Sequence, residues 1–149
     1  MNRKKIKRVK RLHSLESKKL NLTKTELQKV QNRLFENARQ LAFLNQQLES
    51  EMNAPVSSET TIADLQHRNF RSELVERSIE STESHKLEIE SHQNQLLHRI
   101  MQQKATLTGW EKLIQKMEQE DAHELANKEM NEQDDRYLHT ITNEKRRGS

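Results

Sequence analysis

The residues closest to a known catalytic pattern are His123 and Glu124. The stretch from His123 to Asn127 reads His-Glu-Leu-Ala-Asn. It differs by one residue from the His-Glu-x-x-His pattern, in which two histidines on one helical face hold zinc and the glutamate acts as a general base. Asn127 occupies the place of the second histidine, so the metal-binding pair is incomplete. We therefore predict no metal site and no catalytic residues.

Glycine and cysteine are too scarce for most other kinds of site. The chain has two glycines, Gly109 and Gly148, and no cysteine. Loops that cradle phosphate groups are rich in glycine, and disulfides and thiolate zinc sites need cysteine. His85, His92 and His98 lie among serine, glutamate and glutamine, and we expect them in solvent. We therefore expect a protein that is not an enzyme and has no cofactor.

The composition is that of long helices with a narrow apolar stripe. Of 149 residues, 31% are apolar and 33% are charged, whereas a globular domain carries a larger apolar share. A two-helix seam needs only about two apolar residues in seven. No apolar run approaches the roughly 20 residues of a membrane span, and the basic start lacks the apolar core of a signal peptide. We expect a cytoplasmic protein without direct membrane insertion.

A first helix is predicted from about Asn2 to about Met52, because apolar residues recur there at every seventh position. Such a repeat keeps one seam facing a partner helix. A flanking row, three residues further on, is only half apolar. The main row is Ile6, His13, Leu20, Leu27, Leu34, Leu41 and Leu48, and the flanking row is Val9, Glu16, Thr23, Val30, Asn37, Leu44 and Glu51.

The only proline, Pro55, ends this helix and lets the chain turn back on itself. Proline disfavours helix in the residue before it, and Ser57 and Ser58 are good N-caps for a new helix. We therefore predict a turn over about residues 53–58.

A second helix is predicted from about Glu59 to about Lys145. Near its start, Thr61 and Asp64 have the spacing of a capping box. Its seam is most polar from Ser81 to Gln95. The two rows of this seam are Leu65, Ser72, Ile79, Lys86, Gln93, Ile100, Leu107 and Ile114, and Val75, Thr82, Ile89, Leu96, Gln103, Trp110 and Met117.

The predicted fold is all-α, a single domain over residues 1–149. It is a long two-helix antiparallel coiled-coil hairpin with a longer second helix. Pairing about the turn would place residue 1 near about residue 111 and leave about 30 residues of the second helix unpaired, or roughly 50 Å. We expect the protein to be a monomer.

Charge is distributed unevenly along the chain. Between Met1 and Lys19 there are nine lysines and arginines and one acidic residue, Glu16. Between Glu118 and Asp135 there are eight carboxylates and one lysine. Such a distribution suits docking between oppositely charged surfaces. Both runs are also consistent with solvated helix faces, and the sequence leaves the two interpretations open.

A leucine-zipper transcription factor is the main alternative. A basic helix followed by leucine heptads would read the major groove of DNA as a parallel dimer, and Asn2, Lys10 and Leu20 satisfy an Asn-x7-Lys-x9-Leu spacing. The segment from Arg3 to Val9 lacks the small residues expected beside the asparagine, and the second helix would have no role. We therefore favour a protein that binds no nucleic acid. A generic coiled-coil spacer or chaperone is a further alternative.

Five apolar residues lie off the predicted seams, namely Phe35, Ala42 and Phe43 on the first helix and Phe70 and Leu74 on the second. The predicted turn brings Phe70 level with Ala42 and Phe43. Exposed apolar clusters of this kind mark interaction sites. A small shift of the seam would bury them instead, and the sequence is compatible with both.

Three short motifs are spread over nearly the whole chain. Val9, Leu12, His13 and Glu16 form a hydrophobic, basic and acidic start. A Trp-x-x-Leu motif begins at Trp110, and residues 132–135 read Glu-Gln-Asp-Asp. Together with the chain length, the short tip and the longer second helix, these motifs resemble the FliJ/YscO family of type III export systems. Those systems serve the bacterial flagellum and the virulence injectisome.

The resemblance implies a cytoplasmic, non-enzymatic component peripheral to the membrane export machinery. Family members look like the central stalk of a rotary ATPase. Their paired terminal helices sit in the pore of the hexameric export ATPase, a face near the tip meets the membrane export gate protein, and they are linked to export chaperones. By this resemblance, the ATPase contacts would be Arg3, Lys4, Lys5, Lys7, Arg8 and Trp110, and the gate contacts Asn37, Leu41, Leu44, Leu48, Phe70 and Leu74.

Overall fold

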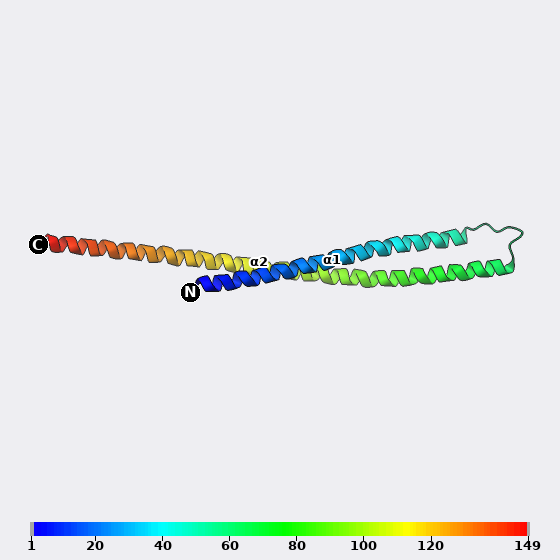
Figure 1. The fold of residues 1–149 in the computed structure, drawn as a ribbon, viewed down its shortest axis with the longest axis horizontal. Helices are drawn as coiled ribbons and strands as arrows, with labels where there is room; N and C mark the ends of the chain where they lie inside the picture. The colour runs from blue at the N-terminus through cyan, green and yellow to red at the C-terminus, as the bar shows by residue number, and fades with distance from the viewer. Residues whose placement is uncertain (1, 149) are drawn as a thin grey trace. The chain divides into compact units, whose positions relative to one another are not determined.

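A computed structural model of the chain describes residues 2–148, with side chains from Arg3 onwards. It contains two helices, α1 (Asn2–Met52) and α2 (Ile62–Arg147), and no strand within the described range. The two helices run antiparallel and are joined by a loop over residues 53–61 (Figure 1). The all-α hairpin with a longer second helix is therefore confirmed. Met1 and Ser149, which the predicted domain included, lie outside the described residues.

Contacts group the residues into two compact units. The hairpin unit covers residues 20–102, which are the later part of α1, the loop and the first part of α2. The terminal unit consists of α1 up to Lys19 and of α2 from Gln103 onwards.

The core of the hairpin unit is built from the predicted seam rows. Val30, Ile89 and Leu96 are buried and pack together, and the partly buried Leu27 and Leu34 lie against them. Full burial of such a side chain contributes about 1.5–3 kcal/mol. The leucine heptads of α1 therefore face α2 of the same chain, whereas the zipper alternative requires them to face a second copy.

Cross-helix contacts set the register of the hairpin unit. The side chain of Asn37 lies beside Thr82, and Arg71 Nε lies 3.6 Å from Glu51 Oε1. Because Glu51 is next to the last residue of α1, the first turns of α2, residues 62–70, extend past the end of α1 (Figure 1). The seam residue Leu65 is exposed for this reason.

The prediction that Phe70 lies level with Ala42 and Phe43 along the hairpin is wrong. Phe70 lies level with the end of α1, whereas Phe43 lies nine residues before that end, about 13 Å along the helix. The difference arises at the loop. It is longer than predicted, and it runs along the start of α2 and does not turn directly from one helix into the other.

The start of α2 at Ile62 follows from the capping box. Thr61 N–H donates to Asp64 Oδ2 at 3.0 Å, and Asp64 N–H donates to Thr61 Oγ1 at 3.1 Å. Two of the backbone N–H groups left free at a helix start are thereby satisfied. The predicted start near Glu59 is three residues too early, because Ser57, expected as the N-cap, is bonded within the loop. Its N–H donates to Thr60 Oγ1 at 3.0 Å within the loop.

Arg68 holds the loop against α2. Its guanidinium donates from Nη1 to the carbonyl of Ala54 at 3.0 Å and from Nη2 to the carbonyl of Pro55 at 3.4 Å. These bonds satisfy two carbonyls that lie just beyond the end of α1. A single side chain from the second turn of α2 therefore fixes the path of the loop.

The terminal unit pairs the first turns of α1 with α2 around the buried residues Ile6 and Leu107. Lys10 Nζ lies 2.8 Å from Glu118 Oε1, and Arg3 lines a surface hollow together with Asp121 and Lys128. The start of α1 therefore lies well beyond residue 111 of α2, where pairing about the turn would place it.

The part of α2 without a partner helix is shorter than predicted. Arg3, next to the first residue of α1, lies at the level of residues 121–128 of α2. The unpartnered part therefore begins in this range and runs to Arg147, which is 19 to 26 residues by their numbers, or about 28–39 Å at the helical rise. In Figure 1 it is the orange to red end of α2, and no helix lies beside it. α2 ends at Arg147, two residues later than predicted.

The capping box gives a testable prediction. Thr61→Ala removes the hydroxyl that accepts the Asp64 N–H, and we expect the free energy of unfolding to fall by about 1 kcal/mol, measured by urea unfolding followed by circular dichroism. Ser58→Ala, in the same loop, is the control and should leave it unchanged. Equal stability of Thr61→Ala and the native chain would contradict the cap.

The cap also predicts a pH dependence. Hydrogen bonds from the backbone and then the side chain of Thr61 lower the pKa of the Asp64 carboxyl below its ordinary value of 3.8. A carboxyl whose pKa is lower in the folded state stabilises that state at pH values above its ordinary pKa. This stabilisation is lost as the pH falls through the lowered pKa. Unfolding curves of the native chain and of Asp64→Ala should therefore differ at neutral pH and converge under acid conditions.

Candidate functional site

Exposed apolar side chains surround the loop end of the hairpin unit. Met52, Val56, Ile62, Phe70 and Leu74 are all exposed. Residues 62–70 have no partner on α1, because α1 has already ended at that level. The loop tip is therefore an apolar surface that no described part of the hairpin unit covers, and such surfaces mark interaction sites in soluble proteins.

The five off-seam apolar residues are all exposed. Phe70 is 58% exposed and Leu74 is 45% exposed, and Phe35, Ala42 and Phe43 are exposed as well. A seam shift that buries them is therefore wrong. Leu74 also lies at a shallow hollow beside the seam, lined by Gln47, Ser50, Glu51, Arg71, Leu74 and Val75.

The six residues assigned to gate contact by resemblance differ in accessibility. Phe70 and Leu74 are exposed, whereas Asn37 is only 5% exposed and is bonded within the seam. The three leucines among the six are half-buried and present only an edge to solvent. These are Leu41, Leu44 and Leu48. A partner at the tip therefore reaches Phe70 and Leu74 first.

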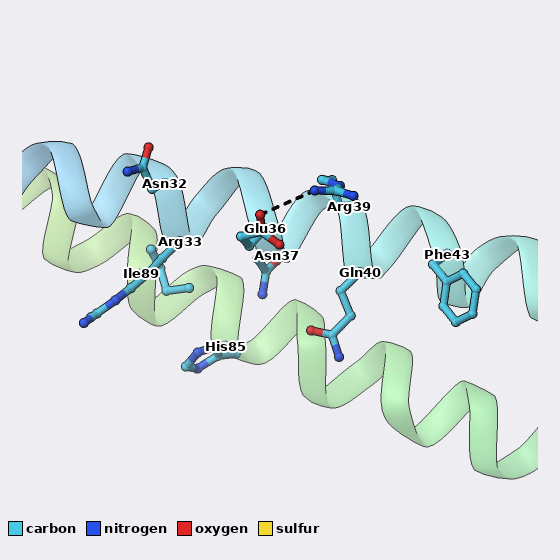
Figure 2. A pocket seen from close by; sticks show the side chains of 9 residues that line it. All are labelled: Asn32, Arg33, Glu36, Asn37, Arg39, Gln40, Phe43, His85 and Ile89. Carbon is cyan, nitrogen blue, oxygen red and sulfur yellow. Dashed lines mark ion pairs between the residues drawn. The ribbon is translucent and has the colours of Figure 1, made fainter.

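A groove of about 620 Å³ lies between α1 and α2 further from the loop (Figure 2). Gln40 and Arg33 reach from α1 towards α2, while Arg39 points away from α2 and lies 3.5 Å from Glu36. The groove is lined by Asn32, Arg33, Glu36, Asn37, Arg39, Gln40, Phe43, His85 and Ile89.

Asn37 is a polar residue of this groove that lies buried in the seam between the two helices. Its Nδ2 donates to the carbonyl of Thr82 at 3.2 Å, and Thr82 Oγ1 donates to the carbonyl of Ser78 at 2.7 Å. Asn37 Oδ1 is buried and has no hydrogen-bond partner. A buried asparagine in a helical seam fixes register at a cost in stability, and the partnerless acceptor contributes to that cost.

The basic start of α1 is exposed. Arg3, Lys4, Lys5, Lys7 and Arg8 all lie in solvent, and the first turn of α1 has no acidic residue. Cations at a helix N-terminus oppose the helix dipole, which favours anions there. This charge therefore works against the stability of α1.

Carboxylates of α2 offset part of the basic charge. Glu118 pairs with Lys10, and Asp121 and Glu124 lie at the hollow that Arg3 lines. The first part of the acidic run therefore lies beside the basic start within the terminal unit, whereas pairing about the turn would place residue 1 near residue 111, before the acidic run begins.

Trp110 lies in the seam of the terminal unit and is half-buried. On the adjacent residue, Glu111 Oε1 lies 3.2 Å from His13 Nε2. Of the residues assigned to ATPase contact by resemblance, the five cations are thus exposed and Trp110 shows only part of its ring.

Three contacts were missed by sequence reasoning, namely those of Arg68 with the loop, Lys10 with Glu118 and His13 with Glu111. The opposite charges of Lys10 and Glu118 were visible in the sequence. They could not be used to predict this contact, because the register assumed from the turn placed the two residues at different levels.

Comparisons with known proteins add no relative: no protein-family model matches the chain, and no match is found among curated proteins or solved structures. Within residues 2–148, no group of three or more His, Asp or Glu side chains could hold a metal ion, and neither helix is long and apolar enough to cross a membrane. The described residues therefore offer two surfaces to a partner, the basic start of α1 and the apolar loop tip.

The buried amide of Asn37 gives a testable prediction. Asn37→Leu removes a partnerless buried acceptor and adds apolar contact, and we expect the free energy of unfolding to rise by about 1–2 kcal/mol. Urea unfolding measures this change. Asn45→Leu, at an exposed position of the same helix, should change it by less than about 0.5 kcal/mol. A destabilised Asn37→Leu variant would show that the amide contributes net stability.

Proposed function

We propose that this chain is a non-enzymatic component of a bacterial type III protein export apparatus, flagellar or virulence-associated. In this proposal it is the central stalk of the hexameric export ATPase and couples that enzyme to the membrane export gate and to export chaperones. The resemblance to the FliJ/YscO family supports the proposal. The observation that carries it is a helical hairpin with two unlike exposed surfaces, a basic one at the start of α1 and an apolar one at the loop.

The basic surface supports contact with the ATPase. Five exposed cations at the start of α1 oppose the dipole of their own helix. Carboxylates of α2 offset this charge only in part, and an anionic partner outside the chain would offset the rest. In the proposed assembly that partner is the pore of the ATPase ring, which electrostatic attraction would help the stalk to find.

The apolar surface supports contact with the gate. Phe70 and Leu74 are exposed at the level where α1 ends, and Leu44 and Leu48 show their edges nearby. Aromatic and aliphatic side chains of this kind supply most of the binding energy when they enter a pocket of a partner.

The mechanism requires no catalytic group from this chain. A pair of helices is asymmetric about its long axis, whereas the ring around it has six equivalent subunits. Different subunits would therefore meet different faces of the stalk. Unequal contacts favour assembly of the ring and bias which subunit turns over.

The test of this proposal is a titration into the hexameric export ATPase of the same organism, with phosphate release and hexamer formation as readouts. We expect stimulation at a ratio near one chain per six ATPase subunits. Absence of both binding and stimulation would refute the stalk function.

Charge reversal provides a second prediction. Replacing Arg3, Lys4, Lys5, Lys7 and Arg8 by glutamate should weaken association with the ring by about tenfold or more, or about 1.4 kcal/mol. The difference should shrink at high salt, because salt screens exposed charges. Reversal of Lys24, Lys29 and Arg39, exposed cations further along α1, is the control and should change affinity little. Association that is independent of salt would count against an electrostatic contact.

Truncation of the exposed side chains at the loop tip gives a further testable prediction. Phe70→Ala with Leu74→Ala should lower affinity for the export gate by about tenfold or more, measured by titration calorimetry. Helicity and ATPase stimulation should be retained, because neither side chain contributes to the buried core. Phe35→Ala, which truncates an exposed phenylalanine away from the loop, should bind the gate normally. Unchanged affinity of the double variant would exclude a gate contact at the tip.

A further inference from the structure

We infer that one flank of the terminal unit is a docking site for an acidic amphipathic helix of another protein. This flank is the leucine flank, made of Leu12, Leu15, Gly109 and Leu113. It shares no residue with the groove of Figure 2 or with the loop tip. The inference does not depend on the proposed export role, because it is argued from the leucines, the glycine and the charges of this flank. Arg8, on the border of the flank, is the one residue shared with the charges proposed for ATPase contact.

The position of the flank follows from an ion pair on the opposite side. Lys10 and Glu118 meet at 2.8 Å on one side of the helix pair. At 100° per residue, Leu12 lies about 160° around α1 from Lys10, and Leu113 lies about 140° around α2 from Glu118. Both leucines therefore lie on the far side, beside the seam. The neighbouring contact between His13 and Glu111 places them within about one turn of each other.

The leucines of this flank are exposed. Leu12, Leu15 and Leu113 are 44%, 50% and 40% exposed. Positions that flank the seam of a coiled coil are commonly glutamate or lysine, because they border water. Leu12 and Leu113 occupy such positions, and Leu15, three residues from Leu12, lies one step further from the seam. Together they form an apolar strip that the described residues of the terminal unit leave uncovered.

Gly109 lies on the same flank and has no role within the fold. Glycine weakens a helix interior relative to alanine, yet its φ is not positive and a Cβ built there would meet nothing within 4 Å. Neither backbone conformation nor packing inside the chain therefore requires glycine. Because Gly109 has no side chain, the surface of α2 beside Trp110 is flat there, and the backbone of a partner helix can approach it closely.

The charges around the flank define the partner. Arg8, Arg11, Lys112 and Lys116 are exposed and lie three, four or seven residues from members of the flank, which places them on its borders. Two carboxylates lie nearby. Glu16 is within 3.3 Å of Lys19, and Glu120 lies at the far end, seven residues from Leu113. A partner that matches this surface has leucine-like residues in one stripe and glutamates beside it.

The experiment uses the full chain and two synthetic 28-residue helical peptides. Both carry leucine at the a and d positions of four heptads, and the e and g positions are glutamate in one and lysine in the other. Binding is followed through the fluorescence of Trp110, the single tryptophan, which adjoins Gly109. The test variants are Gly109→Leu, which fills the flat place, and Leu12→Ser with Leu113→Ser. The control is Gln115→Leu, which adds a leucine at an exposed position off the flank.

We expect the acidic peptide to bind saturably, both test variants to bind at least about tenfold more weakly, and the control to bind like the native chain. The basic peptide should not bind. Circular dichroism of Gly109→Leu should show undiminished helix, since leucine favours helix over glycine. No binding of the acidic peptide, or equal binding by Gly109→Leu, would overturn the inference. So would sedimentation showing a dimer that Gly109→Leu abolishes, because a second copy would then occupy the flank.

Discussion

The register between α1 and α2 is the constraint on which the rest of the structure depends. In the hairpin unit, Val30, Ile89 and Leu96 supply the apolar contact, and the bond from Asn37 to the Thr82 carbonyl adds a polar contact that a slipped pairing would lose. Long helices gain most of their stability from such tertiary packing and little from propensity alone. The same register decides which side chains are left uncovered, and therefore where partners can bind.

Much of this fold could be predicted from the sequence, because heptad spacing assigns residues to the seam without knowledge of the partner. The capping box of Thr61 and Asp64 was equally visible. The register was not, because a heptad pattern fits its partner almost as well after a shift of seven residues. The register is set by cross-helix contacts such as those of Asn37 with the Thr82 carbonyl and of Arg71 with Glu51. The loop that goes with this register is longer than predicted and is held by Arg68 through the carbonyls of Ala54 and Pro55. The heptad pattern placed Phe70 and Leu74 off the seam but left open whether they are exposed, and their exposure was settled by the structure. The pairing of Lys10 with Glu118 needed the register.

The surfaces left by this register differ in their physics. At the loop, aromatic and aliphatic side chains stand clear because α2 begins beyond the end of α1. At the start of α1, cations that the carboxylates of α2 offset only in part oppose the helix dipole. An apolar surface binds through burial and is insensitive to salt, whereas a basic one binds through attraction that salt weakens. A chain with both is suited to hold two partners of different chemistry, as the proposed link between an ATPase and an export gate requires.

The most direct test of the account is a pair of distances within the hairpin unit. The chain has no cysteine, so nitroxide labels can be attached to Asn45→Cys with Glu76→Cys and to Asn45→Cys with Asn69→Cys, and compared by double electron–electron resonance. The two α2 positions differ by one heptad, about 10 Å along the helix. The register described here predicts the shorter distance for the pair at 45 and 76. A shorter distance for the pair at 45 and 69 would contradict it and restore pairing about the turn.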